Sequence, residues 1–149
     1  MKKLPFIAMI ALSTGLIIGC SSRTNEALAQ TGPTIAFSSD FKGSVDEAKS
    51  SHKPILMTFH TASCGWCRRM EDVTFRDTEV IRLSKQFVNV RIDADEESNL
   101  ASSFGADGYP YTVVVSPSGK IVGSIVGYVE PNDFAARLKV ALTRPEARD

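Results

Sequence analysis

Short apolar runs separated by polar stretches predict the strands of a sheet between about Thr34 and Thr143. Ile55–His60 and Tyr111–Val115 are rich in β-forming residues and are typical of buried strands. Phe87–Ile92 alternates apolar and polar positions, which is the period of a strand. The remaining expected strands are Ile121–Val126, a hairpin partner that follows the turn Pro117-Ser118-Gly119, and a short edge strand at Thr34–Phe37.

Helical spacing and capping residues predict the helices between these strands. Ser44 and Glu47 fit a capping box for a helix that ends near Ser51. A second helix should begin near Cys64, break around Thr74–Arg76, and resume with Asp77 as its N-cap until about Lys85. The others are Glu96–Phe104, stopped by Gly105, and a last helix from Pro131 with Phe134, Leu138, Ala141 and Leu142 on one face.

The predicted order is β-α-β-α-β-α-β-β-α, which is typical of an α/β fold with a central mixed sheet flanked by helices. The central strands are connected through helices, so we expect that part of the sheet to be parallel. The last two strands form a hairpin and are therefore antiparallel.

The amino terminus has a different pattern. Met1–Lys3 is positively charged, and an almost wholly apolar stretch follows, which predicts a signal peptide over residues 1–19. Ile17-Ile18-Gly19-Cys20 resembles the bacterial lipobox, in which the Cys becomes the lipidated first residue of the mature protein. There are two alternatives: Cys20 is an ordinary residue in an uncleaved anchor, or cleavage follows Ala29, a site that lies far from the apolar stretch.

We therefore expect three segments: a lipoprotein signal at 1–19, a lipidated Cys20 with a flexible tether at 20–33, and a domain at 34–149. The protein would then be exported to the periplasm or cell envelope and held on a membrane by its lipid. Ser21 is not the aspartate that usually signals inner-membrane retention in Gram-negative bacteria, which favours the outer membrane there.

Charge excludes one class of partner. The 149 residues hold 17 basic and 17 acidic side chains, so the formal net charge is zero. No basic excess is present to hold a nucleic-acid backbone, and we expect no nucleic-acid partner.

The three cysteines carry the chemistry that the sequence predicts. Cys64 and Cys67, two residues apart at a helix start after a strand, are close enough to form and break a disulfide. If Cys20 is lipidated, no other cysteine remains for a structural disulfide. A structural disulfide and half of a metal site are the alternatives, but a zinc site needs four ligands and the chain adds only His52 and His60, in no familiar spacing. We expect no metal.

Cys64 at the helix N-terminus is the expected nucleophile, and the deeper Cys67 would resolve the mixed disulfide. Such exchange needs no organic cofactor, and we expect none.

The chain resembles thioredoxin-like proteins from about Phe37 to Leu142. The landmarks are the strand followed by Cys64-Gly65-Trp66-Cys67, the run Gly108-Tyr109-Pro110 before another strand, and Gly127 ahead of the last helix. Within the family the chain is similar to the C-terminal domain of the thiol carrier DsbD and related exported proteins, through Lys53-Pro54 and through Thr74-Phe75 followed by Asp77 and Val80.

The resemblance implies roles for the neighbours of the cysteines. Pro110 would be a cis proline that faces the CxxC motif, and Tyr109 would offer backbone hydrogen bonds to an extended substrate; an ordinary trans proline is the alternative. Gly65 lets a partner backbone approach, and Trp66 presents an apolar face for docking unless it simply packs on the domain. His60 could favour the thiolate if it lies close, although a partly buried histidine at a strand end is the simpler interpretation.

One departure from the family stands out. Thioredoxins usually carry a buried Asp six residues before the first Cys, paired with a Lys on the next strand; here Thr58 holds the first position, and the second falls near Asn89. The Asp is the family's proposed proton acceptor, so its loss puts efficient general disulfide reduction in question. Water or Glu71 is a conceivable substitute.

The sequence thus predicts a thiol–disulfide oxidoreductase that exchanges its CxxC pair with protein disulfides or dithiols. We expect a reductase fed by a membrane thiol donor, and a monomer. Two alternatives stay open at this point: a disulfide oxidase or isomerase, and a client-specific thiol-binding assembly factor with little turnover.

Overall fold

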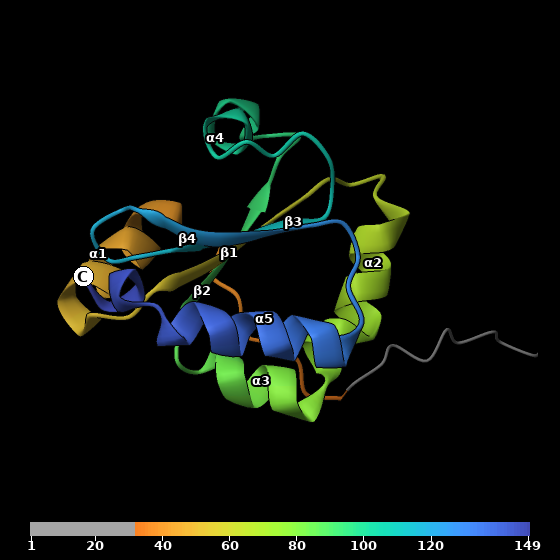
Figure 1. Cartoon of the computed structure of the whole chain (residues 1–149). Coiled ribbons are helices and arrows are strands. Elements are labelled where there is room, and N and C mark those ends of the chain that lie inside the picture. Colours follow the sequence, from red (N-terminus) through yellow and green to blue (C-terminus); the bar gives the residue numbers. More distant parts are fainter. Residues whose placement is uncertain (1–31) are drawn as a thin grey trace, which may run out of the picture.

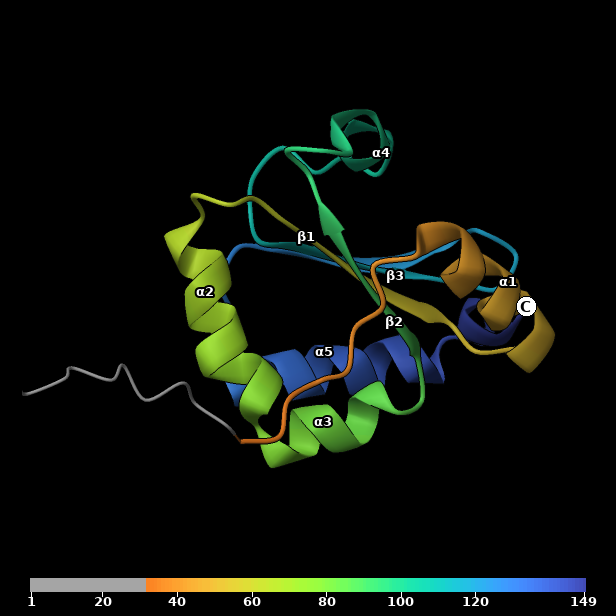
Figure 2. The ribbon, with the colours of Figure 1, turned by 180° about the vertical axis from the view of Figure 1, so that it is seen from behind.

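The computed structural model describes residues 32–149, which form a mixed four-stranded sheet with helices on both faces (Figures 1 and 2). The strands lie in the order β2-β1-β3-β4. They are β1 (Ile55–His60), β2 (Val88–Asp93), β3 (Tyr111–Val115) and β4 (Ile121–Val126). The helices are α1 (Phe41–Ser51), α2 (Gly65–Asp72), the 3₁₀ turn η1 (Thr74–Arg76), α3 (Thr78–Ser84), α4 (Ser98–Ser103), α5 (Pro131–Thr143) and the 3₁₀ turn η2 (Pro145–Arg148).

The strand directions confirm the mixed sheet but correct one part of the expectation. β1 and β2 are parallel, whereas β3 runs antiparallel to β1 and β4 antiparallel to β3. The chain leaves β2 and enters β3 at the same end of the sheet, where α4 lies (Figure 1). Six helical residues span about 9 Å, which is too short to carry the chain back along the sheet.

Two apolar clusters hold the sheet between its layers. On one face, Leu56 and Val114 pack with residues of α2, α3 and α5, among them Met70, Leu83 and Leu138. On the other face, Met57 and other inward residues of β1–β3 pack with Ala48 of α1 and Ala101 of α4. The alternation of side chains along each strand produces this division. The expected α/β fold class, a thioredoxin fold, is confirmed.

The first part of the domain differs from the expectation. Thr34–Phe37 is not a strand, because its backbone bonds to η1 instead. The next residue, Ser38, forms an isolated β-bridge with Val90. The Ile35 N–H and the Thr34 hydroxyl both donate to the Phe75 carbonyl, at 3.0 and 3.1 Å.

The capping box at Ser44 is also wrong. α1 begins at Phe41, and its N-cap is Asp40, four residues before Ser44; Asp40 accepts from the Gly43 N–H at 2.9 Å. Ser44 lies inside the helix, where its hydroxyl donates to the Asp40 carbonyl. The Asp was available in the sequence, but the serine and Glu47 together resembled a complete cap.

The other helix ends agree well with the sequence. The break at Thr74–Arg76 is the 3₁₀ turn η1, and Asp77 caps α3 by accepting from the Glu79 and Val80 N–H groups at 2.9 and 3.0 Å. α4 is shorter than expected, since it begins at Ser98 rather than Glu96.

The predicted signal and tether, with Cys20, lie outside the described residues. Within residues 32–149, each helix is too short or too polar to cross a bilayer.

Candidate active site

The two cysteines of the CxxC motif form a disulfide at the start of α2. The S–S distance is 2.02 Å and the two Cα atoms are 5.2 Å apart. β1 ends at His60, a short loop follows, and α2 begins directly after Cys64. The end of a buried strand therefore positions the motif at one end of the sheet (Figure 1).

Cys64 is the N-cap residue of α2. Its Sγ accepts from the Cys67 N–H at 3.0 Å, so the sulfur replaces the side-chain oxygen that usually caps a helix. Backbone N–H groups and the positive end of a helix favour a thiolate at this place. Cys64 is half-buried, whereas Cys67 is only 4% exposed. A partner can therefore reach the first sulfur and not the second.

Side chains from other segments hydrogen-bond to the loop before the motif and fix its position. The Ala62 N–H donates to Asp95 Oδ2 at 2.9 Å, and the Arg68 guanidinium donates to the Ala62 carbonyl at 3.3 Å. Asp95 follows β2, so a neighbouring strand helps to position the cysteines. Sequence reasoning missed Asp95, because no local pattern marks a side chain that bonds a backbone 33 residues away.

Beside the motif, the Tyr109–Pro110 peptide bond is cis, as the resemblance implies. The Pro110 carbonyl accepts from the Gly127 N–H at 2.8 Å, and Gly127 has φ 77°, a conformation that favours glycine. Two of the three family landmarks are thus joined by one hydrogen bond.

The Trp66 side chain lies on the surface rather than in the core. Its side chain is 63% exposed, and its ring lies 5.6 Å from the ring of Tyr128. The Arg69 guanidinium carbon is 5.9 Å from the centre of the same Tyr128 ring, as a cation–π contact. Trp66, Tyr109, Gly127 and Tyr128 line a shallow cavity of about 280 Å³. Tyr128 was missed in the sequence, although it directly follows the landmark Gly127.

Gly65 leaves its position open as expected. A Cβ atom there would meet only an Arg68 nitrogen, at 3.9 Å. The space above residue 65 is therefore free for a partner.

An uncharged hydroxyl, that of Thr58, occupies the position of the family's buried Asp. Thr58 is 2% exposed, and its Oγ1 lies 3.1 Å from Oγ1 of Thr112, which is 1% exposed. The two residues are opposite each other on β1 and β3. A buried threonine needs a partner for its hydroxyl, and that requirement was the signal that could have pointed to Thr112.

The β2 residues beside Thr58 are given by the strand register. Asn89 lies opposite Leu56, and the residue opposite Thr58 is Arg91. Arg91 Nη1 donates to Glu71 Oε1 at 2.7 Å, and both side chains are a little over a third exposed. The carboxylate suggested as a substitute proton acceptor is thus held by a guanidinium.

The His60 side chain makes no hydrogen bond to Cys64 or Cys67. Its carbonyl accepts from the Ala94 N–H at 2.8 Å, and in the described part of the chain its imidazole makes no hydrogen bond or ion pair. Nor do residues 32–149 contain three or more His, Cys, Asp or Glu side chains grouped to hold a metal ion.

The fold and this site together define a class: thioredoxin-fold domains with the CxxC disulfide of thiol–disulfide oxidoreductases. The chain belongs to the thioredoxin-like domain family, whose family model matches residues 41–142.

Three individual proteins illustrate the similarity. Human spermatogenesis-associated protein 20 is 32% identical over 104 residues, which cover 62% of this chain and 13% of that protein. The thiol:disulfide interchange protein DsbD of Campylobacter jejuni is 22% identical over 104 residues, 67% of this chain and 18% of the relative. The solved structure of the oxidoreductase DsbH superposes with a TM-score of 0.63 at 22% identity, covering 81% of this chain and 96% of DsbH.

The chain therefore spans only a small part of the first two relatives. The likeness to DsbH supports the fold.

Proposed function

We propose that this protein is an exported, membrane-tethered oxidoreductase that reduces disulfides of client proteins with the Cys64–Cys67 pair. The observation that carries the proposal is the asymmetry of the two sulfurs. Cys64 is half-buried at the N-cap of α2, and Cys67 is 4% exposed behind it.

The asymmetry divides the reaction into two steps. In the reduced protein, the Cys64 thiolate attacks one sulfur of a client disulfide; the client S–S bond breaks and its other sulfur leaves as a thiolate. Cys67 then loses its proton and attacks Cys64 Sγ, which breaks the mixed disulfide and releases the second client thiolate. Two electrons pass to the client, whose two thiolates take up protons, and Cys64–Cys67 ends as the disulfide seen here.

The open surface beside Cys64 supports binding of an extended client segment. Trp66 and Tyr128 offer adjoining aromatic faces, and Gly65 presents no side chain. Tyr109 precedes the cis proline and lines the same cavity, so its backbone is suited to pair with the client.

The proton of Cys67 has to leave without a buried carboxylate. Glu71 follows Cys67 by one helical turn, so the two side chains lie on the same side of α2. Arg91 Nη1 donates to this carboxylate at 2.7 Å and holds it in place. We therefore assign proton acceptance to Glu71, directly or through water.

The name of the DsbD relative, a thiol:disulfide interchange protein, supports a second dithiol as the source of electrons. We propose that a membrane thiol carrier reduces Cys64–Cys67 after each turnover, and that the protein works as a monomer without an organic cofactor. The apolar run at residues 4–18 and the lipobox-like segment before Cys20 support the membrane tether.

The decisive experiment is the reduction potential of the Cys64–Cys67 pair, equilibrated against glutathione or dithiothreitol buffers. A value near that of thioredoxin, about −270 mV, is expected for a reductase. A value near that of DsbA, about −120 mV, would reverse the direction and make the protein an oxidase or isomerase. A pair that does not cycle at all would remove the enzymatic function.

A turnover assay separates the reductase from an assembly factor that binds one client. The reductase should reduce insulin catalytically, while Cys67→Ala should accumulate a mixed disulfide through Cys64. A protein that traps a client through Cys67→Ala but leaves insulin intact would be a binding module.

The tether is tested on the whole chain in a bacterial host. Labelled palmitate should be incorporated into the protein and lost in Cys20→Ala, and the protein should then move from the membrane fraction to the soluble fraction. Unlabelled wild-type protein in the soluble fraction would contradict the lipid anchor and leave the redox assays unaffected.

A further inference from the structure

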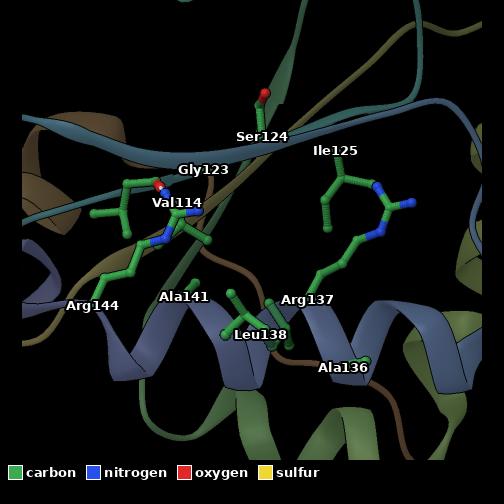
Figure 3. Close-up of a pocket in the computed structure, with 11 residues that line it drawn as sticks. Val114, Gly123, Ser124, Ile125, Ala136, Arg137, Leu138, Ala141 and Arg144 are labelled. Atoms are coloured by element: carbon green, nitrogen blue, oxygen red, sulfur yellow. Dashed lines mark hydrogen bonds between the residues drawn. The ribbon is translucent and has the colours of Figure 1, made fainter.

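A second cavity lies between β4 and α5, away from the cysteines (Figure 3). Its volume is about 370 Å³, within the range of small-molecule sites. The inner wall is apolar and includes Val122, Ile125, Leu138 and Ala141. Val140 at the cavity is 55% exposed, so apolar surface continues to the rim.

Two arginines give this apolar cavity a positive rim. Arg137 and Arg144 both line it, and in Figure 3 both side chains rise from α5 and its end toward β4, on either side of Leu138 and Ala141. Arg144 follows Arg137 by seven positions, which is nearly two helical turns or about 10 Å along the axis. An occupant between α5 and β4 would therefore lie between two guanidinium groups.

The two arginines differ in how much of their hydrogen-bonding capacity is in use. Arg144 Nη1 donates to the Val122 carbonyl, which leaves further N–H donors of that guanidinium without a recorded partner. Arg137 makes no hydrogen bond or ion pair with any residue of the described range 32–149. Lys139, between them in the sequence, is already paired with Glu79 at 2.8 Å.

Gly123 keeps the strand wall of the cavity open. It lies opposite Val114 on β3, and both residues line the cavity. A Cβ atom on Gly123 would meet no atom within 4 Å. Glycine weakens a strand interior, and often marks a place where another group approaches the backbone closely.

We infer that the β4–α5 cavity binds a free, single-chain aliphatic carboxylate. The hydrocarbon chain packs on Val122, Ile125, Leu138 and Ala141, where its burial removes apolar surface from water. The carboxylate accepts from the guanidinium of Arg137, whose planar N–H groups match a carboxylate bidentately. A neutral chain gains only the first of these contributions, and a cationic chain is repelled.

The test is a binding titration of the full domain with decanoate, followed by amide NMR shifts and calorimetry below the micelle concentration. Decanoate should shift amides of β4 and α5, whereas decanol should bind at least about tenfold more weakly and decyltrimethylammonium should not bind. Arg137→Gln should weaken decanoate binding about tenfold, since a charge-assisted hydrogen bond is lost.

Two variants serve as controls. Lys139→Gln removes a positive charge from the same helix but not from the cavity, and should leave the affinity unchanged. Gly123→Leu should fill the open strand wall and block binding, with folding checked by its circular dichroism spectrum. Insulin reduction by Arg137→Gln should equal that of the wild type, because Arg137 is absent from the site around Cys64.

Equal binding of the acid, the alcohol and the ammonium compound would overturn the inference, as would unchanged affinity in Arg137→Gln. Co-sedimentation with anionic phospholipid vesicles, in the absence of any decanoate binding, would show that this face meets a membrane surface instead.

Discussion

The exposed residues around Cys64 and the buried residues of the site differ in exposure and in chemistry. The entrance, formed by Cys64, Trp66, Tyr109 and Tyr128, is open, and its tryptophan is 63% exposed. Three interior residues, Cys67 and the hydroxyl pair Thr58 and Thr112, which we call the floor, are at most 4% exposed, and none of them carries an ionised side chain. In the proposed mechanism, the entrance selects a client and begins the exchange, and Cys67 completes it from the floor. Attack and release are thus open to separate adjustment in one small site.

Thr58 also shows how a buried carboxylate can be replaced. An ionised group in the core is costly unless it is well paired, and this chain uses two hydroxyls that need only each other. The charges that remain, Glu71 and Arg91, lie where water still reaches them.

Cys64→Ser should produce the largest effect, because it removes the attacking sulfur of the entrance. Insulin reduction, followed by turbidity, should fall to the uncatalysed background. Cys67→Ser should also stop turnover but should still form mixed disulfides, visible on non-reducing gels. Equal failure of both variants to form mixed disulfides would contradict the division of roles.

Thr58→Val should be the next largest change, and it acts on the floor. The variant leaves the Thr112 hydroxyl buried without its partner, which costs about 1–3 kcal/mol of unfolding free energy. Urea denaturation of the oxidised protein measures the loss.

The matched control is the double variant Thr58→Val with Thr112→Val. Replacing both hydroxyls by methyl groups should restore most of the stability. A double variant as unstable as the sum of the single ones would mean that the two hydroxyls do not interact.

Trp66→Ala should affect only the entrance. We expect kcat/KM for a protein disulfide to fall about tenfold, since aromatic side chains carry much of the binding energy at interfaces. The unfolding free energy should stay close to that of the wild type, because the side chain is largely exposed. Ile121→Ala, which removes another exposed apolar side chain 54% open to solvent, should leave turnover unchanged.

The smallest effect should come from a region outside the site. Hydrogen bonds from Arg82 and then Lys139 lower the pKa of Glu79 from its ordinary 4.5 to about 2. A carboxyl with a lowered folded-state pKa stabilises the fold above pH 4.5, and that contribution is lost as the pH falls from 4.5 to about 2. Because the pair is at the surface, the contribution is small.

Glu79→Gln therefore should be slightly less stable than the wild type at pH 6, and the two should converge near pH 2. Acid unfolding followed by circular dichroism measures the difference, with Glu47→Gln as a control. A constant difference across this pH range would contradict the assignment. Insulin reduction at pH 7 should be the same in both variants.

Local patterns in the sequence predicted most of the fold. The strands at 111–115 and 121–126 were predicted with their observed ends, and Asp77 was identified as a cap, because strand period and helix capping are properties of neighbouring residues. The expected strand at 34–37 was wrong, because its backbone bonds to Phe75, a choice made by tertiary structure.

The same distinction holds within the site. The CxxC motif and the proline at 110 were recognisable from short runs of sequence. Tyr128, Thr112 and Asp95 act across the fold, on residues 33 to 62 positions away, and no short pattern marks them. Strand register decides such pairs: it places Arg91 opposite Thr58 and Asn89 opposite Leu56.

The stacking of Trp66 on Tyr128 has a practical consequence. Trp66 is the single tryptophan of the chain, and it lies between the two cysteines. All indole emission of the protein therefore originates at the active site, and we expect its intensity to change when the neighbouring disulfide is reduced. The redox state of the protein, and the arrival of a client on this ring, can be followed in real time by fluorescence without any added label.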